Sequence, residues 1–125
     1  MRLPLLALLA AALATEAAAL DFTRILSERA FREHVADRVL TDDLGGTILF
    51  AGNGGIGGAR DKMAVSGGWV WTGEALCRRV RLDGIDTGAD CLHLWIKGDA
   101  VVLQARQGRG AETWLTVAPR RGRAD

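Results

Sequence analysis

The chain has little of the side-chain chemistry on which most enzymes depend. Its 125 residues include no tyrosine, two histidines, two cysteines and two serines. Neither Ser27 nor Ser66 lies in the glycine-flanked turn that exposes a serine nucleophile. His34 has no second histidine or cysteine at the spacing of a metal site, so we expect a surface position for it and no bound metal.

An excess of charge of one sign is also missing. The 16 Lys and Arg residues nearly balance the 15 Asp and Glu residues, which leaves a formal net charge of +1. Nucleic-acid binding needs a concentrated basic surface that neutralises phosphates, so we do not expect nucleic acid as a partner.

The apolar run at the N-terminus, Leu3–Leu13, is about half the ~20 residues that span a bilayer. Arg2 precedes it, and the small residues 17–19 follow it, which is the pattern of a cleavable signal peptide. We expect cleavage after Ala19, with residues 12–14 as the alternative site. No cysteine lies directly after the run, where a lipid anchor would be attached. The protein is therefore expected in the periplasm or secreted, with no stable membrane insertion after cleavage.

The rest of the chain is predicted to form a single β-domain over residues 20–118, followed by a basic disordered tail over 119–125. Ser27 can cap a short helix over Glu28–Ala36, because its side chain can accept a hydrogen bond from the first turn. From Val39 onward, short apolar runs alternate with glycine-rich turns about every ten residues. This spacing is typical of an antiparallel up-and-down meander or a partly closed, lipocalin-like barrel. The clearest expected strands are 47–51, 55–60, 63–71, 75–82 and 112–117.

A hairpin through the loop Asp83–Asp86 is expected to bring the two cysteines together. If the hairpin is centred on Gly84, Cys77 lies opposite Cys91 and Arg78 lies opposite Asp90. Paired cysteines in an exported chain form a disulfide. Further hairpin turns are expected at Asn53-Gly54, as a type I′ turn, at residues 61–62, 72–74 and 97–99, and at 108–110.

Two strings resemble enzyme signatures. Gly52–Gly57 matches the G-x-G-x-x-G dinucleotide pattern, but the residues that follow alternate like a strand instead of forming the required helix. Asp86–Ala89 reads DTGA, as in aspartic proteases, whose chemistry needs two carboxylates that share a proton. Gly84 interrupts the apolar strand that should precede this aspartate. We interpret both strings as hairpin turns and expect no catalytic residue and no cofactor.

Alternation of apolar and polar residues assigns the faces of the strands. The expected core face carries Trp69, Trp71, Leu76, Val80, Leu82, Leu92, Leu94, Ile96, Val101, Leu103 and Ala105. The expected outer face carries Arg79, Arg81, His93, Trp95, Gln104 and Arg106. The arginines of the outer face can form a solvated surface or a docking surface for an anionic lipid, a glycan or an acidic protein.

Arg78 is the exception on the apolar face. A buried guanidinium needs a charged partner or an aromatic ring. One interpretation is an Arg78–Asp90 pair with Trp69 closing the mouth of the barrel. The other is a ligand site, formed by Trp69, Trp71, Arg78 and Asp90, in which Arg78 recognises an anion at the rim of an apolar pocket.

The run GGWVWTGEALCR at residues 67–78, followed by Cys91, resembles an uncharacterised family of small exported bacterial β-domains of the alphaproteobacterial type. The resemblance implies a periplasmic, lipocalin-like fold and no known activity. Some members carry a transferred label, dihydrodipicolinate reductase, for which this chain lacks the cofactor-binding unit.

Together these observations predict an exported, non-enzymatic β-domain that binds a small apolar or anionic ligand in its barrel. The alternative is an envelope module that interacts with, or inhibits, another protein. An enzyme of the aspartic-protease or reductase type is disfavoured.

Overall fold

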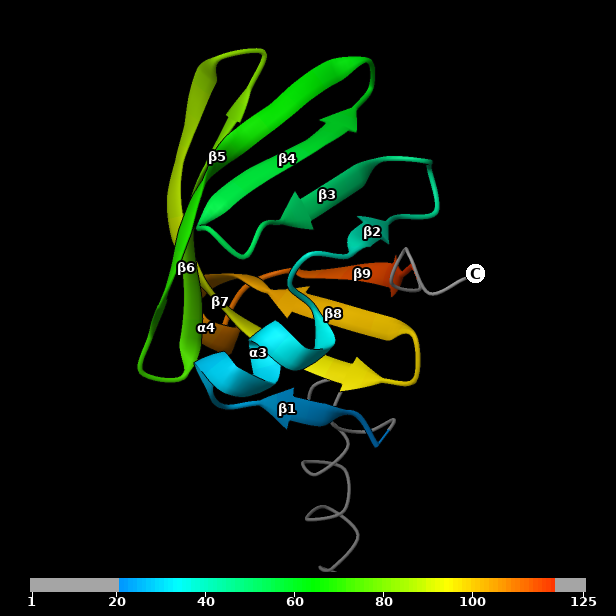
Figure 1. Ribbon diagram of the computed structural model, residues 1–125, viewed down its shortest axis with the longest axis vertical. Coiled ribbons are helices and arrows are strands. Elements are labelled where there is room, and N and C mark those ends of the chain that lie inside the picture. The colour runs from blue at the N-terminus through cyan, green and yellow to red at the C-terminus, as the bar shows by residue number, and fades with distance from the viewer. Residues whose placement is uncertain (1–20, 119–125) are drawn as a thin grey trace, which may run out of the picture.

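The computed structural model describes residues 21–118 as a closed, eight-stranded antiparallel barrel with one extra strand (Figure 1). This confirms the predicted fold class. The predicted signal peptide and the predicted basic tail lie outside the described residues. In chain order the elements are β1 (Thr23–Ile25), α3 (Glu28–His34), β2 (Val39–Thr41), β3 (Thr47–Phe50), β4 (Gly55–Arg60), β5 (Met63–Thr72), β6 (Ala75–Leu82), β7 (Ile85–Lys97), β8 (Ala100–Gln104), α4 (Ala105–Gly108) and β9 (Glu112–Val117).

The barrel wall is a meander in which each strand from β2 to β9 pairs with the next one along the chain. Pairing of β2 with β9 closes it. The long strand β7 pairs with β6 along its first half, and with β8 and the short strand β1 along its second half. The sequence pattern did not predict β1.

Helix α3 packs against one end of the barrel. Its N-cap Ser27 accepts a hydrogen bond from the Ala30 N–H at 3.1 Å. Phe31, fully buried, contacts the rings of Phe50, Trp69 and Trp71 at centroid distances of 5.8, 4.9 and 5.6 Å. The predicted helix is confirmed, although it ends two residues earlier than expected. Its aromatic contacts form the closed end of the barrel.

The predicted face assignment is confirmed for the core. All the residues expected on the core face belong to, or pack against, one hydrophobic cluster. Gln104 lies opposite His93 on the predicted outer face, where it is nevertheless buried.

The turn at Asn53-Gly54 is not the predicted type I′ turn. Only Gly54 has a positive φ, +97°, whereas a type I′ turn needs positive φ at both central residues. The Asn53 side chain instead accepts a hydrogen bond from the Gly55 N–H at 2.9 Å. Two other hairpin turns, Asp61-Lys62 and Asp83-Gly84, do have positive φ at both central positions.

The pairing of β6 with β7 confirms the predicted register, with Cys77 opposite Cys91 and Arg78 opposite Asp90. The predicted loop was too long, because the chain turns at Asp83-Gly84 alone and β7 begins at Ile85. A β-bulge follows in β7, where the register shifts between Arg79 and Arg81. The DTGA string therefore lies in a bulged strand and not in a turn.

The last connection also differs from the prediction. The expected turn at residues 108–110 is preceded by α4, a single turn in which Arg106 and Gln107 adopt left-handed φ values of 53° and 52°. The Gly110 N–H donates to the Ala105 carbonyl at 2.8 Å. The chain thus leaves β8 at Ala105, before the glycines.

The disulfide between Cys77 and Cys91 links β6 to β7 across 14 positions of sequence. Replacing both cysteines by alanine is expected to lower the free energy of unfolding by about 3 kcal/mol, because the bond restricts the unfolded chain to a closed loop. Urea unfolding followed by tryptophan fluorescence measures this. Reduction of the unmodified protein should give a similar loss, and an unchanged midpoint in both samples would contradict the prediction.

Candidate functional site: a cavity inside the barrel

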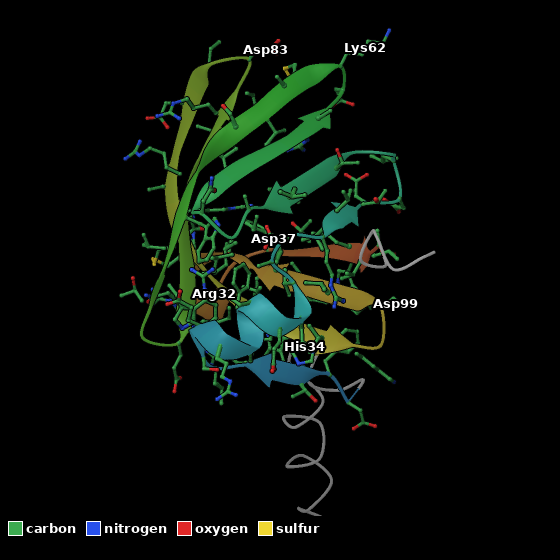
Figure 2. The ribbon with its side chains drawn as sticks, in the orientation of Figure 1. Arg32, His34, Asp37, Lys62, Asp83 and Asp99 are labelled. Carbon is green, nitrogen blue, oxygen red and sulfur yellow. A yellow bond between two sulfur atoms is a disulfide. The ribbon has the colours of Figure 1, made fainter. Side chains whose placement is uncertain are left out.

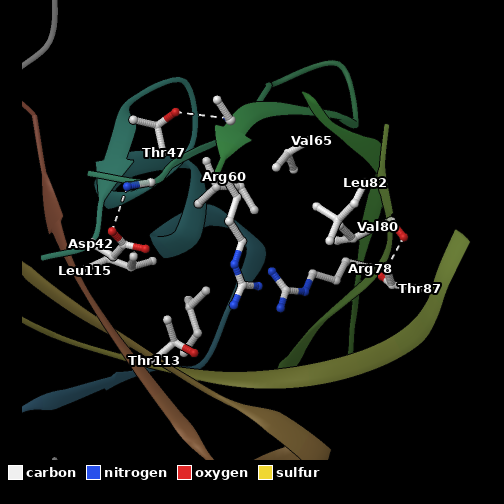
Figure 3. Close-up of a pocket in the computed structure, with 14 residues that line it drawn as sticks. Asp42, Thr47, Arg60, Val65, Arg78, Val80, Leu82, Thr87, Thr113 and Leu115 are labelled. Atoms are coloured by element: carbon white, nitrogen blue, oxygen red, sulfur yellow. Dashed lines mark hydrogen bonds between the residues drawn. The ribbon is translucent and has the colours of Figure 1, made fainter. Parts of the chain in front are cut away.

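The barrel contains a partly open cavity of about 300 Å³ at the end away from the aromatic contacts of α3 (Figure 3). Val65 near the start of β5 and Leu82 at the end of β6 line the cavity. Their counterparts at the other end of this strand pair, Trp71 on β5 and Leu76 on β6, do not. The lining residues are Asp42, Gly46, Thr47, Ile48, Ala59, Arg60, Val65, Arg78, Val80, Leu82, Thr87, Leu103, Thr113 and Leu115. Figure 2 shows Lys62 and Asp83 at the tips of the β4–β5 and β6–β7 hairpins, beyond this end of the barrel.

Arg78 reaches the cavity from the middle of β6, where it lies between Trp69 on β5 and Asp90 on β7. Burial lowers the pKa of the Arg78 guanidinium, and the negative charge of Asp90 partly offsets this. An arginine nevertheless stays protonated at neutral pH. Within residues 21–118, Arg78 has no hydrogen bond and no ion pair within 4.0 Å. It is a largely buried cation without a bonded counter-ion.

Arg60 brings a second guanidinium to the same cavity from the end of β4. Figure 3 shows the guanidinium groups of Arg60 and Arg78 pointing toward one another. Arg60, too, makes no hydrogen bond or ion pair with the described part of the chain. Two like charges that face each other repel. An anion placed between them would be attracted to both, and these attractions would offset the repulsion.

The other polar groups of the lining differ in whether they are available to a ligand. The Thr87 hydroxyl donates to the Val80 carbonyl at 2.7 Å, and the Thr47 hydroxyl accepts from the Ala59 N–H at 3.2 Å. Asp42 accepts from two N–H groups of its own turn, at 2.9 and 2.7 Å. The Thr113 hydroxyl bonds to none of the described residues. Thr113 and the two arginines are thus the uncommitted polar groups.

The two tryptophans predicted to line the ligand site do not line this cavity. Their rings pack on Phe31, and their indole N–H groups donate to backbone carbonyls, Trp69 to Ala51 and Trp71 to Gly73, each at 2.8 Å. Both are therefore part of the closed end of the barrel.

Asp90 does not line the cavity either, and it forms no close pair with Arg78. Its carboxylate accepts from the backbone N–H groups of Cys91, at 2.8 Å, and Arg106, at 3.2 Å. Asp90, Trp69 and Arg78 do line a second, more open hollow beside the β3–β4 hairpin. The interior cavity is the better candidate, because it is more enclosed and because the indole and the carboxylate of the hollow already have partners.

The residues predicted as an outer interaction face lie apart from one another. Arg79 forms an ion pair with Asp86, near the β6–β7 turn where Arg81 also lies. His93 lies on the other half of β7, and Arg106 lies in α4. Burial lowers the pKa of the partly buried His93, and the positive charge of Arg24 adds to this effect. The structure gives no single basic patch from these four residues.

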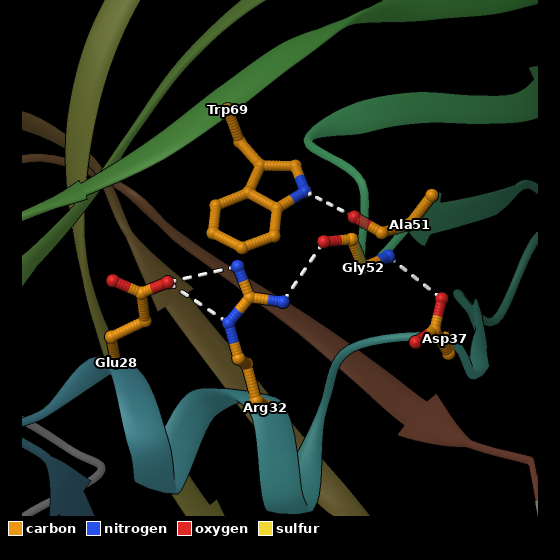
Figure 4. A network of polar contacts seen from close by, with 6 residues as sticks. All are labelled: Glu28, Arg32, Asp37, Ala51, Gly52 and Trp69. Atoms are coloured by element: carbon orange, nitrogen blue, oxygen red, sulfur yellow. Dashed lines mark hydrogen bonds and ion pairs between the residues drawn. The ribbon is translucent and has the colours of Figure 1, made fainter.

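A cluster that the sequence did not predict holds the glycine-rich hairpin in place (Figure 4). Arg32 of α3 pairs with Glu28 at 2.8 Å, donates to the Gly52 carbonyl at 2.9 Å and lies 5.1 Å from the ring centre of Trp69. Asp37 accepts from the Gly52 N–H at 2.7 Å. A phosphate loop needs free backbone N–H groups, and here the N–H groups of Gly52, Gly54 and Gly55 are bonded within the protein. The signal in the sequence was the i,i+4 spacing of Glu28 and Arg32.

Within residues 21–118, no three or more His, Cys, Asp or Glu side chains converge to hold a metal ion. No helix of this region is long and apolar enough to cross a membrane. In comparisons with known proteins, no family model, no curated protein and no solved structure matches this chain, so the family resemblance stays a prediction.

Proposed function

We propose that the protein is an exported, non-enzymatic binding protein that takes a small ligand with an anionic group into its barrel. The observation that carries this proposal is the guanidinium of Arg78, which lies largely buried at the cavity without a bonded counter-ion. The rest of the lining is mostly aliphatic. An apolar cavity with a few convergent polar groups is the usual form of a small-molecule site.

The energetics of Arg78 favour a binding role over a structural one. A charge taken out of water without a partner lowers the stability of the folded state. A hydrophobic side chain of similar length at this position would avoid that cost. A bound anion would supply the missing partner through charge-assisted hydrogen bonds, which are stronger than neutral ones.

Export is part of the proposal. The signal-peptide pattern of residues 1–19 supports it, and so does the Cys77–Cys91 disulfide, because disulfides persist in oxidising compartments. The periplasm or the extracellular space is accordingly the proposed location.

The test is an Arg78→Met substitution in the protein purified from the periplasm. Native mass spectrometry should show a co-purifying adduct on the unmodified protein, and the substitution should weaken its binding about 10- to 100-fold, because a hydrogen-bonded charge is lost. The melting temperature of the unliganded variant should stay the same or rise. Arg81→Met, on the outer face of the same strand, is the matched control and should retain the adduct.

A structural role for Arg78 predicts different results. The substitution would then lower the melting temperature, and the unmodified protein would carry no adduct. That pair of results would overturn the proposal and move the preference to the envelope interaction module, with affinity capture from envelope extract as the next measurement.

A further inference from the structure

We infer that the anionic group of the ligand is a phosphate monoester, held between Arg60 and Arg78, on a compact apolar body. This inference rests on the proposed function and adds the chemical class of the ligand. It follows from the directions of the two guanidinium groups, from the charge of the lining and from the size and composition of the cavity.

The two arginines approach from different parts of the wall. Arg60 lies on β4 and Arg78 on β6, with β5 between them, and their guanidinium groups face each other across the cavity (Figure 3). A carboxylate is planar and presents its two oxygens to one guanidinium fork. A phosphate has three terminal oxygens that point in different directions, so it can accept hydrogen bonds from both guanidinium groups at once.

The remaining oxygen has a donor available in the cavity. Thr113 lies on β9, across the barrel from β5, and its hydroxyl has no bond to the described residues. The threonine hydroxyls of the other walls are engaged with the backbone. Two guanidinium groups and one hydroxyl thus line one cavity from separate strands, which suits a tetrahedral group.

The charge of the lining points the same way. Its one carboxylate, Asp42, is bonded to the N–H groups of Leu44 and Gly46 and forms no ion pair with either arginine. Two cations therefore lack a counter-charge at hydrogen-bonding distance. A phosphate monoester carries close to two negative charges above its second pKa of about 6, whereas a carboxylate carries one.

The aliphatic side chains and the volume of the cavity indicate the nature of the rest of the ligand. Ile48, Val65, Val80, Leu82, Leu103 and Leu115 line the cavity around the arginines. Inorganic phosphate would leave these aliphatic side chains in contact with water, so an ester with an apolar body should bind more tightly. A volume of about 300 Å³ lies at the lower limit for ligand pockets. The body is therefore about the size of one ring or a short branched chain, and a diacyl lipid does not fit.

The test compares three probes by isothermal titration calorimetry on the full mature protein at pH 7.5 and low salt: phenyl phosphate, benzoate and inorganic phosphate. Phenyl phosphate is expected to bind about tenfold or more tightly than either of the others, since one additional charged hydrogen bond is worth about that factor. Lowering the pH below about 6 should weaken the binding of phenyl phosphate as its dianion takes up a proton, while benzoate changes little down to pH 5.

Two variants separate the contributions of the arginines. Arg60→Gln, at an exposed position with no bond to the described residues, should keep the fold and reduce phenyl phosphate binding to the level of benzoate. Arg78→Met should weaken the binding of both. Arg81→Met should change neither.

The possible failures differ from that of the proposed function. If benzoate binds as tightly as phenyl phosphate and its binding depends on Arg78, the phosphate assignment is overturned and the proposed function stands. If none of the probes binds, the phosphate assignment is again overturned, and the proposed function is then decided by the adduct on the purified protein.

Discussion

Replacing Gly67 by alanine is expected to lower the free energy of unfolding by about 4 kcal/mol, at the upper end of the range for single substitutions. Gly67 lies in the barrel wall on β5 with φ +150°, a conformation that other residues rarely adopt. A Cβ atom there would meet the backbone carbonyl of Arg79 on β6, well under the 3.0 Å that real Cβ atoms keep. Backbone atoms in a paired strand cannot move aside without breaking the β5–β6 pairing, so the strain remains in the folded state.

Gly57 on β4 provides the matched control for Gly67. A Cβ atom at Gly57 would have no other atom within 4 Å, and its φ is outside the left-handed region. Gly57→Ala should therefore change the free energy of unfolding by no more than about 0.5 kcal/mol. Urea unfolding of both variants, followed by tryptophan fluorescence, measures the difference. Equal midpoints for the two variants would show that the β5–β6 contact does not constrain the barrel.

Phe31→Ala is expected to cost about 3–5 kcal/mol of the free energy of unfolding. The ring of Phe31 is fully buried and contacts three other aromatic rings, so its removal leaves a cavity that rigid neighbours cannot fill. It also removes edge-to-face contacts that are worth more than their buried area alone. Because α3 has seven residues, too few to be stable alone, the helix should detach from the barrel in this variant.

Leu26→Ala is the control, because Leu26 precedes the same helix but is 51% exposed. Its substitution should cost less than about 1 kcal/mol. Circular dichroism and thermal unfolding of both variants would measure the effects. A loss below about 1 kcal/mol for Phe31→Ala would contradict the assignment of these rings to the closed end of the barrel.

The hairpin of the two cysteines shows what the sequence could predict and what it could not. Symmetry about Gly84 placed Cys77 opposite Cys91, which is the pairing observed. The structure reaches this pairing by a tighter turn at Asp83-Gly84 followed by a bulge, and the extra residue of the bulge compensates for the shorter turn. Bulges leave no clear mark in a single sequence, because they depend on how the neighbouring strands curve.

The candidate site was predictable in part. Alternation along β6 correctly placed Arg78 on the inner face, since the side-chain period of a strand fixes the face. It could not tell which end of the barrel an inward residue occupies, so Trp69 and Trp71 were assigned to a ligand although they pack on Phe31. Arg60 was missed because it precedes the charged turn Asp61-Lys62 and is indistinguishable in sequence from a solvated residue. Its place at the cavity depends on the curvature of the barrel wall, which turns the side chains of β4 and β6 toward each other.

The joint between β2 and β9 has a consequence for how the barrel opens and closes. Every other contact in the barrel wall joins strands that follow one another along the chain, so each can form as a local hairpin. The β2–β9 joint has two register pairs, Leu40 with Val117 and Thr41 with Thr116, and it brings together the first and the last strand of the meander. The entropic cost of long-range closure is concentrated there, so we expect this joint to form last during folding and to separate first in a native-state fluctuation. Asp42 after β2, with Thr113 and Leu115 on β9, borders the cavity. The joint that we expect to open most readily is thus beside the site that a ligand would have to enter.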